Sequence, residues 1–95
     1  MAARPVVEAV ARRDRDLASQ VRRALSSVGL NVAEAFGSGS GNRRLRLESA
    51  RGSAYEAQAA LRIAVAWNHV SAADVATVLA SLDSLSARIF GLSRR

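Results

Sequence analysis

The side chains that could support catalysis are few in this sequence. The chain has one histidine, His69, and no cysteine. Without a second imidazole or a thiol, neither a metal site nor a nucleophile pair can be completed around His69. The glycine-serine segment 37–41 lacks the Lys-Ser/Thr ending of a phosphate-binding loop, so it predicts a turn. The sequence therefore predicts no enzyme activity, no bound metal and no cofactor.

Arginine supplies every basic residue, and the formal net charge is +6. The planar guanidinium can bind phosphate through two hydrogen bonds, so an arginine-rich surface suits a polyanion such as RNA or DNA. Arg15 and Arg22, like Arg44 and Arg51, are seven residues apart, and each pair therefore shares one face of a helix. The candidate nucleic-acid-binding residues form two clusters, which are Arg12, Arg13, Arg15, Arg22 and Arg23, and then Arg43, Arg44, Arg46 and Arg51.

Two interpretations of these arginines are open. They form a track for nucleic acid, or they reflect a GC-rich genome and a solvated, salt-bridged surface that keeps a helical protein in solution. No aromatic residues are interleaved with the clusters for base stacking, and nearby carboxylates can neutralise some of the charge. Whether the arginines are free or paired with Glu34, Glu48 and Glu56 distinguishes the two interpretations.

A second set of polar residues lies on otherwise apolar helices. Folding the chain about segment 37–41 places residues whose numbers sum to about 78 opposite one another, so Glu34 meets Arg44. By the same rule Glu56 meets Arg22 or Arg23, and a buried carboxylate needs such a partner. We expect a structural polar network that fixes helix register, with a ligand pocket as the alternative. The main members of the network are Asn31, Glu34, Ser53 and Glu56, with Gln20, Ser27 and Ser49 beside them.

Sequence signals for helix starts and turns predict two helices in the first half of the chain. Pro5 suits the first turn of a short helix over about 4–13. Asp14 or Asp16 can cap a second helix over about 14–36, whose apolar residues recur at steps of three and four. The glycine-serine segment then turns the chain back, which predicts an antiparallel hairpin.

The second half of the chain carries two more helices. Asn42 is the expected cap of a helix over about 42–68, and Ser71 with Asp74 forms a capping box for a helix over about 71–93. A length of 95 residues suits one domain, here 1–95. The expected fold class is all-α, an antiparallel up-and-down four-helix bundle with a shortened first helix.

The third helix carries two parallel stripes. The first predicts the bundle seam, because its members alternate at steps of three and four. The second has the same spacing, so we expect this helix to be buried over a broad arc, either as the central helix or at a contact between copies. Since the short first helix cannot cover both stripes, we expect a homo-oligomer, with a compact monomer as the alternative. The first stripe is Leu47, Ala50, Ala54, Ala57, Leu61 and Ala64, and the second is Ser49, Ser53, Glu56, Ala60, Ile63 and Trp67.

Composition predicts a cytoplasmic protein. There is no cysteine for disulfides, and the N-terminus lacks the apolar core of a signal peptide. No stretch reaches the uninterrupted apolar length that spans a bilayer, so we expect no membrane contact.

Three segments together resemble a known family. They read LASQVRRA at 17–24, NVAE at 31–34 and ARGSAYE at 50–56. In combination they resemble the four-helix-bundle proteins encoded by intervening sequences in bacterial 23S ribosomal RNA genes, over about residues 14–93. The matching polar positions are Arg22, Arg23, Asn31, Glu34, Arg51, Ser53 and Glu56.

The resemblance implies an antiparallel four-helix bundle that often assembles into a ring-like pentamer and whose biochemical role is mostly not established. We expect a non-enzymatic oligomeric scaffold or adaptor. A relative, the accessory variability determinant of diversity-generating retroelements, implies RNA or DNA and a reverse transcriptase as alternative partners. Family members usually have glycine directly after the Asn-x-Ala-Glu motif, whereas here Ala35 and Phe36 precede Gly37, so the second helix should run further. They also usually begin with a long helix, so either Met1 is not the true start or another copy covers the open side.

Overall fold

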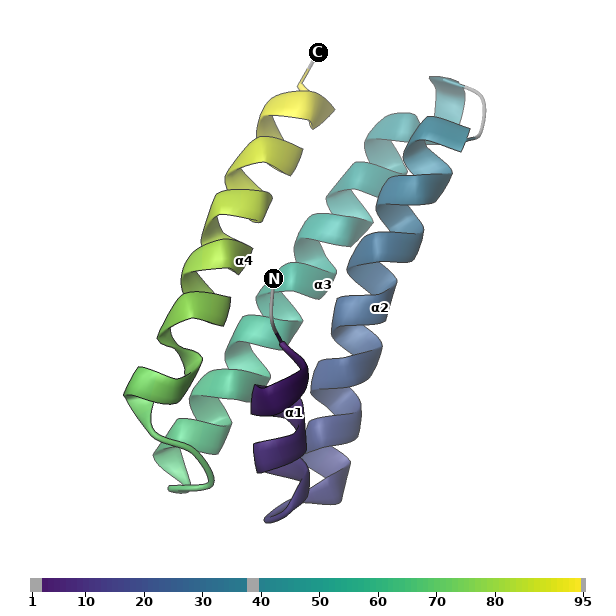
Figure 1. Ribbon diagram of the computed structural model, residues 1–95. Helices are drawn as coiled ribbons and strands as arrows, with labels where there is room; N and C mark the ends of the chain where they lie inside the picture. Colours follow the sequence, from purple (N-terminus) through teal and green to yellow (C-terminus); the bar gives the residue numbers. More distant parts are fainter. Residues whose placement is uncertain (1–2, 38–39, 95) are drawn as a thin grey trace.

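The computed structural model describes residues 3–37 and 40–94 (Figure 1). These residues form four α-helices and a short 3-10 turn, and no strand is found among them. The prediction of an all-α four-helix bundle with a short first helix is therefore confirmed. The elements are α1 (Arg4–Ala11), α2 (Arg15–Gly37), the 3-10 turn η1 (Ser40–Asn42), α3 (Arg43–Ala66) and α4 (Ala72–Ser93).

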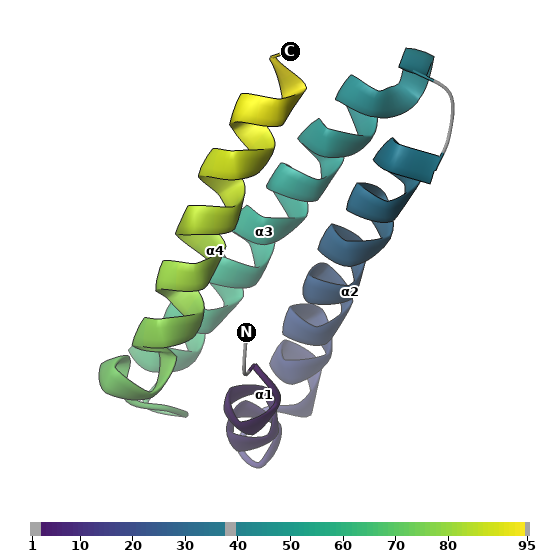
Figure 2. The same cartoon turned by 45° about the horizontal axis from the view of Figure 1, so that its top comes forward.

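The helices form an elongated bundle of 42 × 20 × 18 Å. α2 and α3 make an antiparallel hairpin, α4 packs along α3, and α1 packs on α2 (Figures 1 and 2). α1 has 8 residues, whereas α3 has 24. At a rise of about 1.5 Å per residue, α1 covers only about a third of the length of α3. The position of the fourth helix in the bundle is thus occupied only beside the first turns of α2 (Figure 1).

Two of the three predicted helix caps are formed. The Asp14 Oδ1 atom accepts a hydrogen bond of 2.9 Å from the backbone N–H of Leu17 at the start of α2. Ser71 and Asp74 form the reciprocal capping box of α4. Asn42 precedes α3 but makes no capping hydrogen bond with its side chain. The reason is that the 3-10 turn leads directly into α3, with Asn42 already in a helical backbone conformation.

The first stripe of α3 is the seam of the bundle, as predicted. Leu47 and Leu61 have no exposed surface, and neither do the alanines at the seam positions between them. Alanine side chains are short, so they let the neighbouring helices approach α3 closely. Val21 on α2 and Leu82 on α4 are equally buried and complete the core around this seam.

The second stripe of α3 is not buried along its length. Ala60 is buried and Ser53 is half-buried, but Glu56, Ile63 and Trp67 are exposed, as is Ser49. α3 is thus the central helix, and burial of this stripe at a contact between copies stays a prediction, but within one chain the expected broad buried arc is not formed. The reason is that α3 packs mainly against α2 and α4, and the seam alone faces both of them.

α4 is long and apolar enough to cross a membrane by length and composition, with a mean hydropathy of 1.4 over its best window. The sequence-based expectation relied on uninterrupted apolar residues, which Asp74 and Asp83 prevent here. Within the bundle, α4 places Val75, Val78 and Ile89 in the core. Only 28% of that window is buried within one chain, so much of the helix's hydropathy comes from alanines on its outer face.

Candidate functional site

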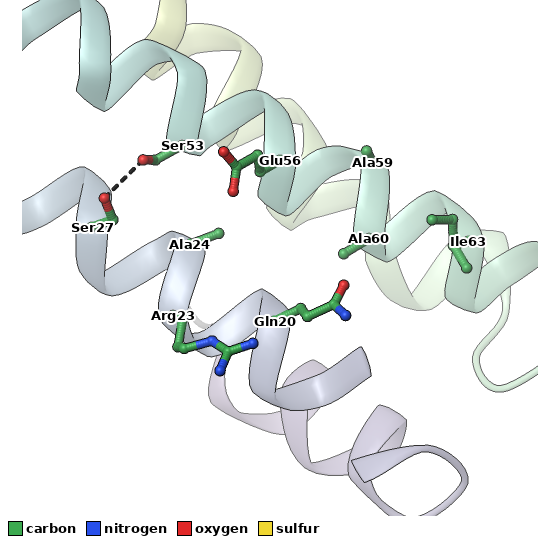
Figure 3. Close-up of a pocket in the computed structure, with 9 residues that line it drawn as sticks. All are labelled: Gln20, Arg23, Ala24, Ser27, Ser53, Glu56, Ala59, Ala60 and Ile63. Atoms are coloured by element: carbon green, nitrogen blue, oxygen red, sulfur yellow. Dashed lines mark hydrogen bonds between the residues drawn. The ribbon is translucent and has the colours of Figure 1, made fainter. Parts of the chain in front are cut away.

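A groove of about 520 Å³ lies between α2 and α3 on the outer side of the hairpin (Figure 3). We call it the α2–α3 groove. Ala24 and Ala60, each 5% exposed, are the most buried of its lining residues. Trp67 lies one helical turn beyond Ile63, where the groove ends. The lining residues are Gln20, Arg23, Ala24 and Ser27 from α2, and Ser53, Glu56, Ala59, Ala60 and Ile63 from α3.

Two contacts fix how α2 and α3 face each other. The Ser27 and Ser53 hydroxyl oxygens are 2.8 Å apart, and Arg46 Nε lies 2.9 Å from Glu34 Oε2. In both pairs the residue numbers add to 80. The predicted pairing of Glu34 with Arg44 is therefore wrong, because α2 extends through Gly37 and η1 shifts the centre of the turn.

Three of the predicted polar residues meet through hydrogen bonds. Asn31 Nδ2 donates to the backbone carbonyl of Ser27 at 2.9 Å and to the Ser27 hydroxyl at 3.1 Å. Ser27 in turn contacts Ser53 on α3, and the ion pair of Glu34 lies about two turns further along α2. This part of the set forms a polar connection between the helices, which supports the structural interpretation of Asn31, Glu34 and Ser53.

Glu56 is not part of that connection. The observed register places it opposite Ala24 rather than opposite Arg22 or Arg23, and it forms no ion pair with any residue in the described ranges. Figure 3 shows Glu56 on the α3 wall of the groove and Arg23 on the α2 wall. The groove thus presents an acid and a base on opposite walls, both exposed to solvent.

The two arginine clusters lie toward opposite ends of the bundle (Figure 1). Among the nine candidates, only two pair with a described carboxylate, Arg44 with Glu48 at 3.1 Å and Arg46 with Glu34 at 2.9 Å. Glu56 neutralises none of them. Within the described chain, the carboxylates therefore neutralise few of the candidate arginines.

Aromatic rings lie against several arginines, although none is interleaved with the clusters in the sequence. The Arg51 guanidinium lies 4.4 Å from the ring centre of Phe90 on α4 and 5.4 Å from that of Tyr55. Arg51 Nη2 donates a hydrogen bond of 2.9 Å to the Tyr55 hydroxyl, and Arg94 lies 5.1 Å from the Phe90 ring centre. We call these four residues the arginine–aromatic site.

A comparable contact occurs at the turn between α2 and α3, where Arg43 lies 4.7 Å from the ring centre of Phe36. The sequence does carry a signal for one of these contacts, since Arg51 and Tyr55 are four residues apart on one helix. Phe90 and Arg94 carry no such signal, because their approach to Arg51 depends on how α4 packs on α3.

His69 has a structural contact rather than a cluster of ligands. Its Nε2 atom lies 3.7 Å from Asp14 Oδ2, which joins the α3–α4 corner to the α1–α2 corner. In the described part of the chain, no group of three or more His, Cys, Asp or Glu side chains could hold a metal ion. Elsewhere, a hydrogen bond of 2.7 Å to Glu8 raises the pKa of the Arg4 guanidinium on the surface of α1.

Comparison with known proteins identifies the family. A family model described as 23S rRNA-intervening sequence protein matches residues 6–91, from α1 into the last turns of α4. No curated protein and no solved structure gives a significant match. The chain belongs to the family of 23S rRNA-intervening sequence proteins.

Proposed function

We propose that the protein is a non-enzymatic scaffold that works as an assembly of several copies of itself. The observation that carries this proposal is the exposed stripe of α3 beside the α2–α3 groove. Trp67 is 71% exposed and Ile63 is 46% exposed. Large apolar side chains in this position are typical of the centre of a protein interface, and tryptophan contributes more to such interfaces than most residues.

The polar residues of the groove fit the same proposal. Glu56 and Arg23 carry opposite charges and pair with no described residue of their own chain. A symmetric contact brings the same surface of two copies together, so each acid can meet the base of the other copy. The small side chains at Ala59 and Ala60 let a helix of the second copy approach the groove closely.

The test is the mass of the protein in solution, measured by light scattering after size exclusion at several concentrations. We expect a stable multiple of the 10.0 kDa chain. Trp67→Ser should lower the mass while the protein keeps its helical circular dichroism spectrum, because the indole is not in the core. Leu30→Ser is the matched control, since Leu30 is 65% exposed and does not line the groove.

A monomer mass at every concentration would contradict this proposal. An equal loss of mass in the tryptophan and leucine variants would contradict the groove as the contact. The ring-like pentamer implied by the family resemblance stays a prediction about subunit number. A ring would join the groove to a different surface of the next copy, whereas a contact between two grooves closes as a dimer, and the measured mass distinguishes the two.

A second candidate function is that of a basic accessory protein that binds nucleic acid. Its support is the charge of +6 together with seven candidate arginines that form no ion pair with the described residues. Fluorescence anisotropy with labelled RNA and DNA over a salt series tests it, because phosphate contacts release counterions and make the affinity fall steeply with salt. Absence of binding at low salt would remove this candidate, whereas a reverse transcriptase as a protein partner stays a separate prediction.

A further inference from the structure

We propose that the arginine–aromatic site binds single-stranded nucleic acid, with bases stacking beside Phe90 and Tyr55 and phosphates bound by Arg51 and Arg94. This inference depends on the second candidate function and assigns it a place in the fold. The site lies where the first half of α3 runs beside the last turns of α4 (Figure 1).

The state of Arg51 is the first argument. Its side chain is only partly exposed, and its Nε atom is buried with no hydrogen-bond partner in the described structure. No described carboxylate pairs with it, so its neighbours are a tyrosine hydroxyl and two rings. A guanidinium that is partly shielded from water and has no counter-ion attracts an anion more strongly than one in bulk solvent.

The rings are the second argument. Tyr55 is 48% exposed and Phe90 is 40% exposed, so both retain surface for a ligand. The arginines beside them present flat guanidinium groups, which stack on bases as aromatic rings do. Stacking requires a base that is not already stacked in a duplex, so these rings favour single strands over double helices.

The surrounding charge is the third argument. Arg44 lies two turns before Arg51 on the same face of α3, and Glu48, which pairs with Arg44, is the carboxylate on this face. Arg51 and Arg94 therefore supply the uncompensated charge of the site. With about two or three phosphate contacts on a single strand, the logarithm of affinity should fall with the logarithm of salt with a slope of about −1.4 to −2.1.

The test is fluorescence anisotropy with a labelled 20-nucleotide poly(U) RNA, the matching poly(dU) DNA and a 20-base-pair duplex. The variants are Phe90→Leu, Arg94→Gln and Arg12→Gln. Arg12→Gln is the charge-matched control, since Arg12 is an exposed arginine at the opposite end of the bundle. Thermal unfolding followed by circular dichroism checks that each variant keeps its fold.

We expect Phe90→Leu to weaken binding of the single strands at least about fivefold, the lower end of the range for losing one stacked base. Arg94→Gln should weaken binding and make the salt slope shallower by about 0.7, whereas Arg12→Gln should change little. The RNA and DNA arms show whether the sugar matters to the site.

Several results would overturn the inference. Wild-type protein that binds no probe at low salt removes both the site and the second candidate function. Binding that is unchanged by Phe90→Leu and Arg94→Gln, or that falls as much with Arg12→Gln, leaves the candidate function but refutes this site. Tighter binding of the duplex than of either single strand also refutes it.

Discussion

Gln58 connects α3 to α4, and its removal should destabilise the bundle. It is 3% exposed, and its Nε2 atom donates to Asp83 Oδ1 at 2.6 Å and to the Leu79 carbonyl at 3.4 Å. A hydrogen bond to a charged acceptor contributes about 1.5–3 kcal/mol, and the lost methylene adds about 0.8 kcal/mol. Hydrogen-bond values from mutational series already include the side-chain entropy that the variant regains, so we expect Gln58→Ala to lower the free energy of unfolding by about 2–4 kcal/mol.

That loss is large for a chain of this size. At roughly 0.1 kcal/mol per residue the total free energy of unfolding is on the order of 10 kcal/mol, and each 1 kcal/mol shifts the melting temperature by about 4–8 °C. Gln58→Ala should therefore melt at least about 8 °C below wild type in circular dichroism, with a parallel shift in urea. Asp83→Asn is the matched control, because its amide oxygen can still accept the bond.

The reasoning fails if Gln58→Ala melts within about 2 °C of wild type, or if Asp83→Asn costs as much. The contact also affects the proposed site. In the pairs Gln58 with Asp83 and Arg51 with Phe90, the residue numbers add to 141 in both cases. Both pairs thus share one α3–α4 register, and loosening the first pair should weaken single-strand binding at the second.

Three further changes test the packing, a cap and a charge, all by thermal and urea unfolding. Ala57→Leu overfills a position with no exposed surface and should cost about 1–3 kcal/mol, whereas Ala76→Leu on the exposed side of α4 should cost little; equal effects would contradict the seam. Asp14→Ala removes the cap of α2 and should cost about 1 kcal/mol, with Asp16→Ala as the nearly neutral control. Glu56→Ala should change stability by less than about 0.5 kcal/mol at the lowest protein concentration, and a larger loss there would show that Glu56 pairs within its own chain.

Local signals predicted much of the fold. The three-four spacing of the α3 seam identified its buried alanines and leucines, because a helix that packs on two neighbours must repeat its apolar residues at that period. The caps at Asp14 and at Ser71 with Asp74 were readable because each depends on residues only three apart. Element types and their approximate ends therefore followed from short windows of sequence.

The register between helices could not be predicted from short windows of sequence in the same way. A helical period says which face is buried but not how far a helix runs before the turn. Here α2 extends through Gly37 and a 3-10 turn precedes α3, which moved the opposing pairs by two residues. That difference gave Glu34 a different arginine partner and left Glu56 opposite an alanine.

The arginine–aromatic site could be predicted from the sequence only in part. Arg51 stood among the candidate arginines, and its contact with Tyr55 follows from a spacing of four. Phe90 reaches Arg51 because of the α3–α4 register, which the corner after Trp67 and the contact of Gln58 with Asp83 define. Long-range packing of this kind has no periodic signature in one sequence.

The two proposed surfaces lie on different sides of α3. Glu56 and Ile63 face the outer side of the hairpin with α2, whereas Arg51 faces α4 and lies against Phe90. Copies that join through the α2–α3 groove would therefore leave the arginine–aromatic site open on every subunit. Several modest sites held at fixed spacing bind one long strand far more tightly than a single site does, because each later contact is intramolecular. This geometry is compatible with both a scaffold role and a nucleic-acid-binding role. Assembly of several copies would then raise the affinity for a long single strand.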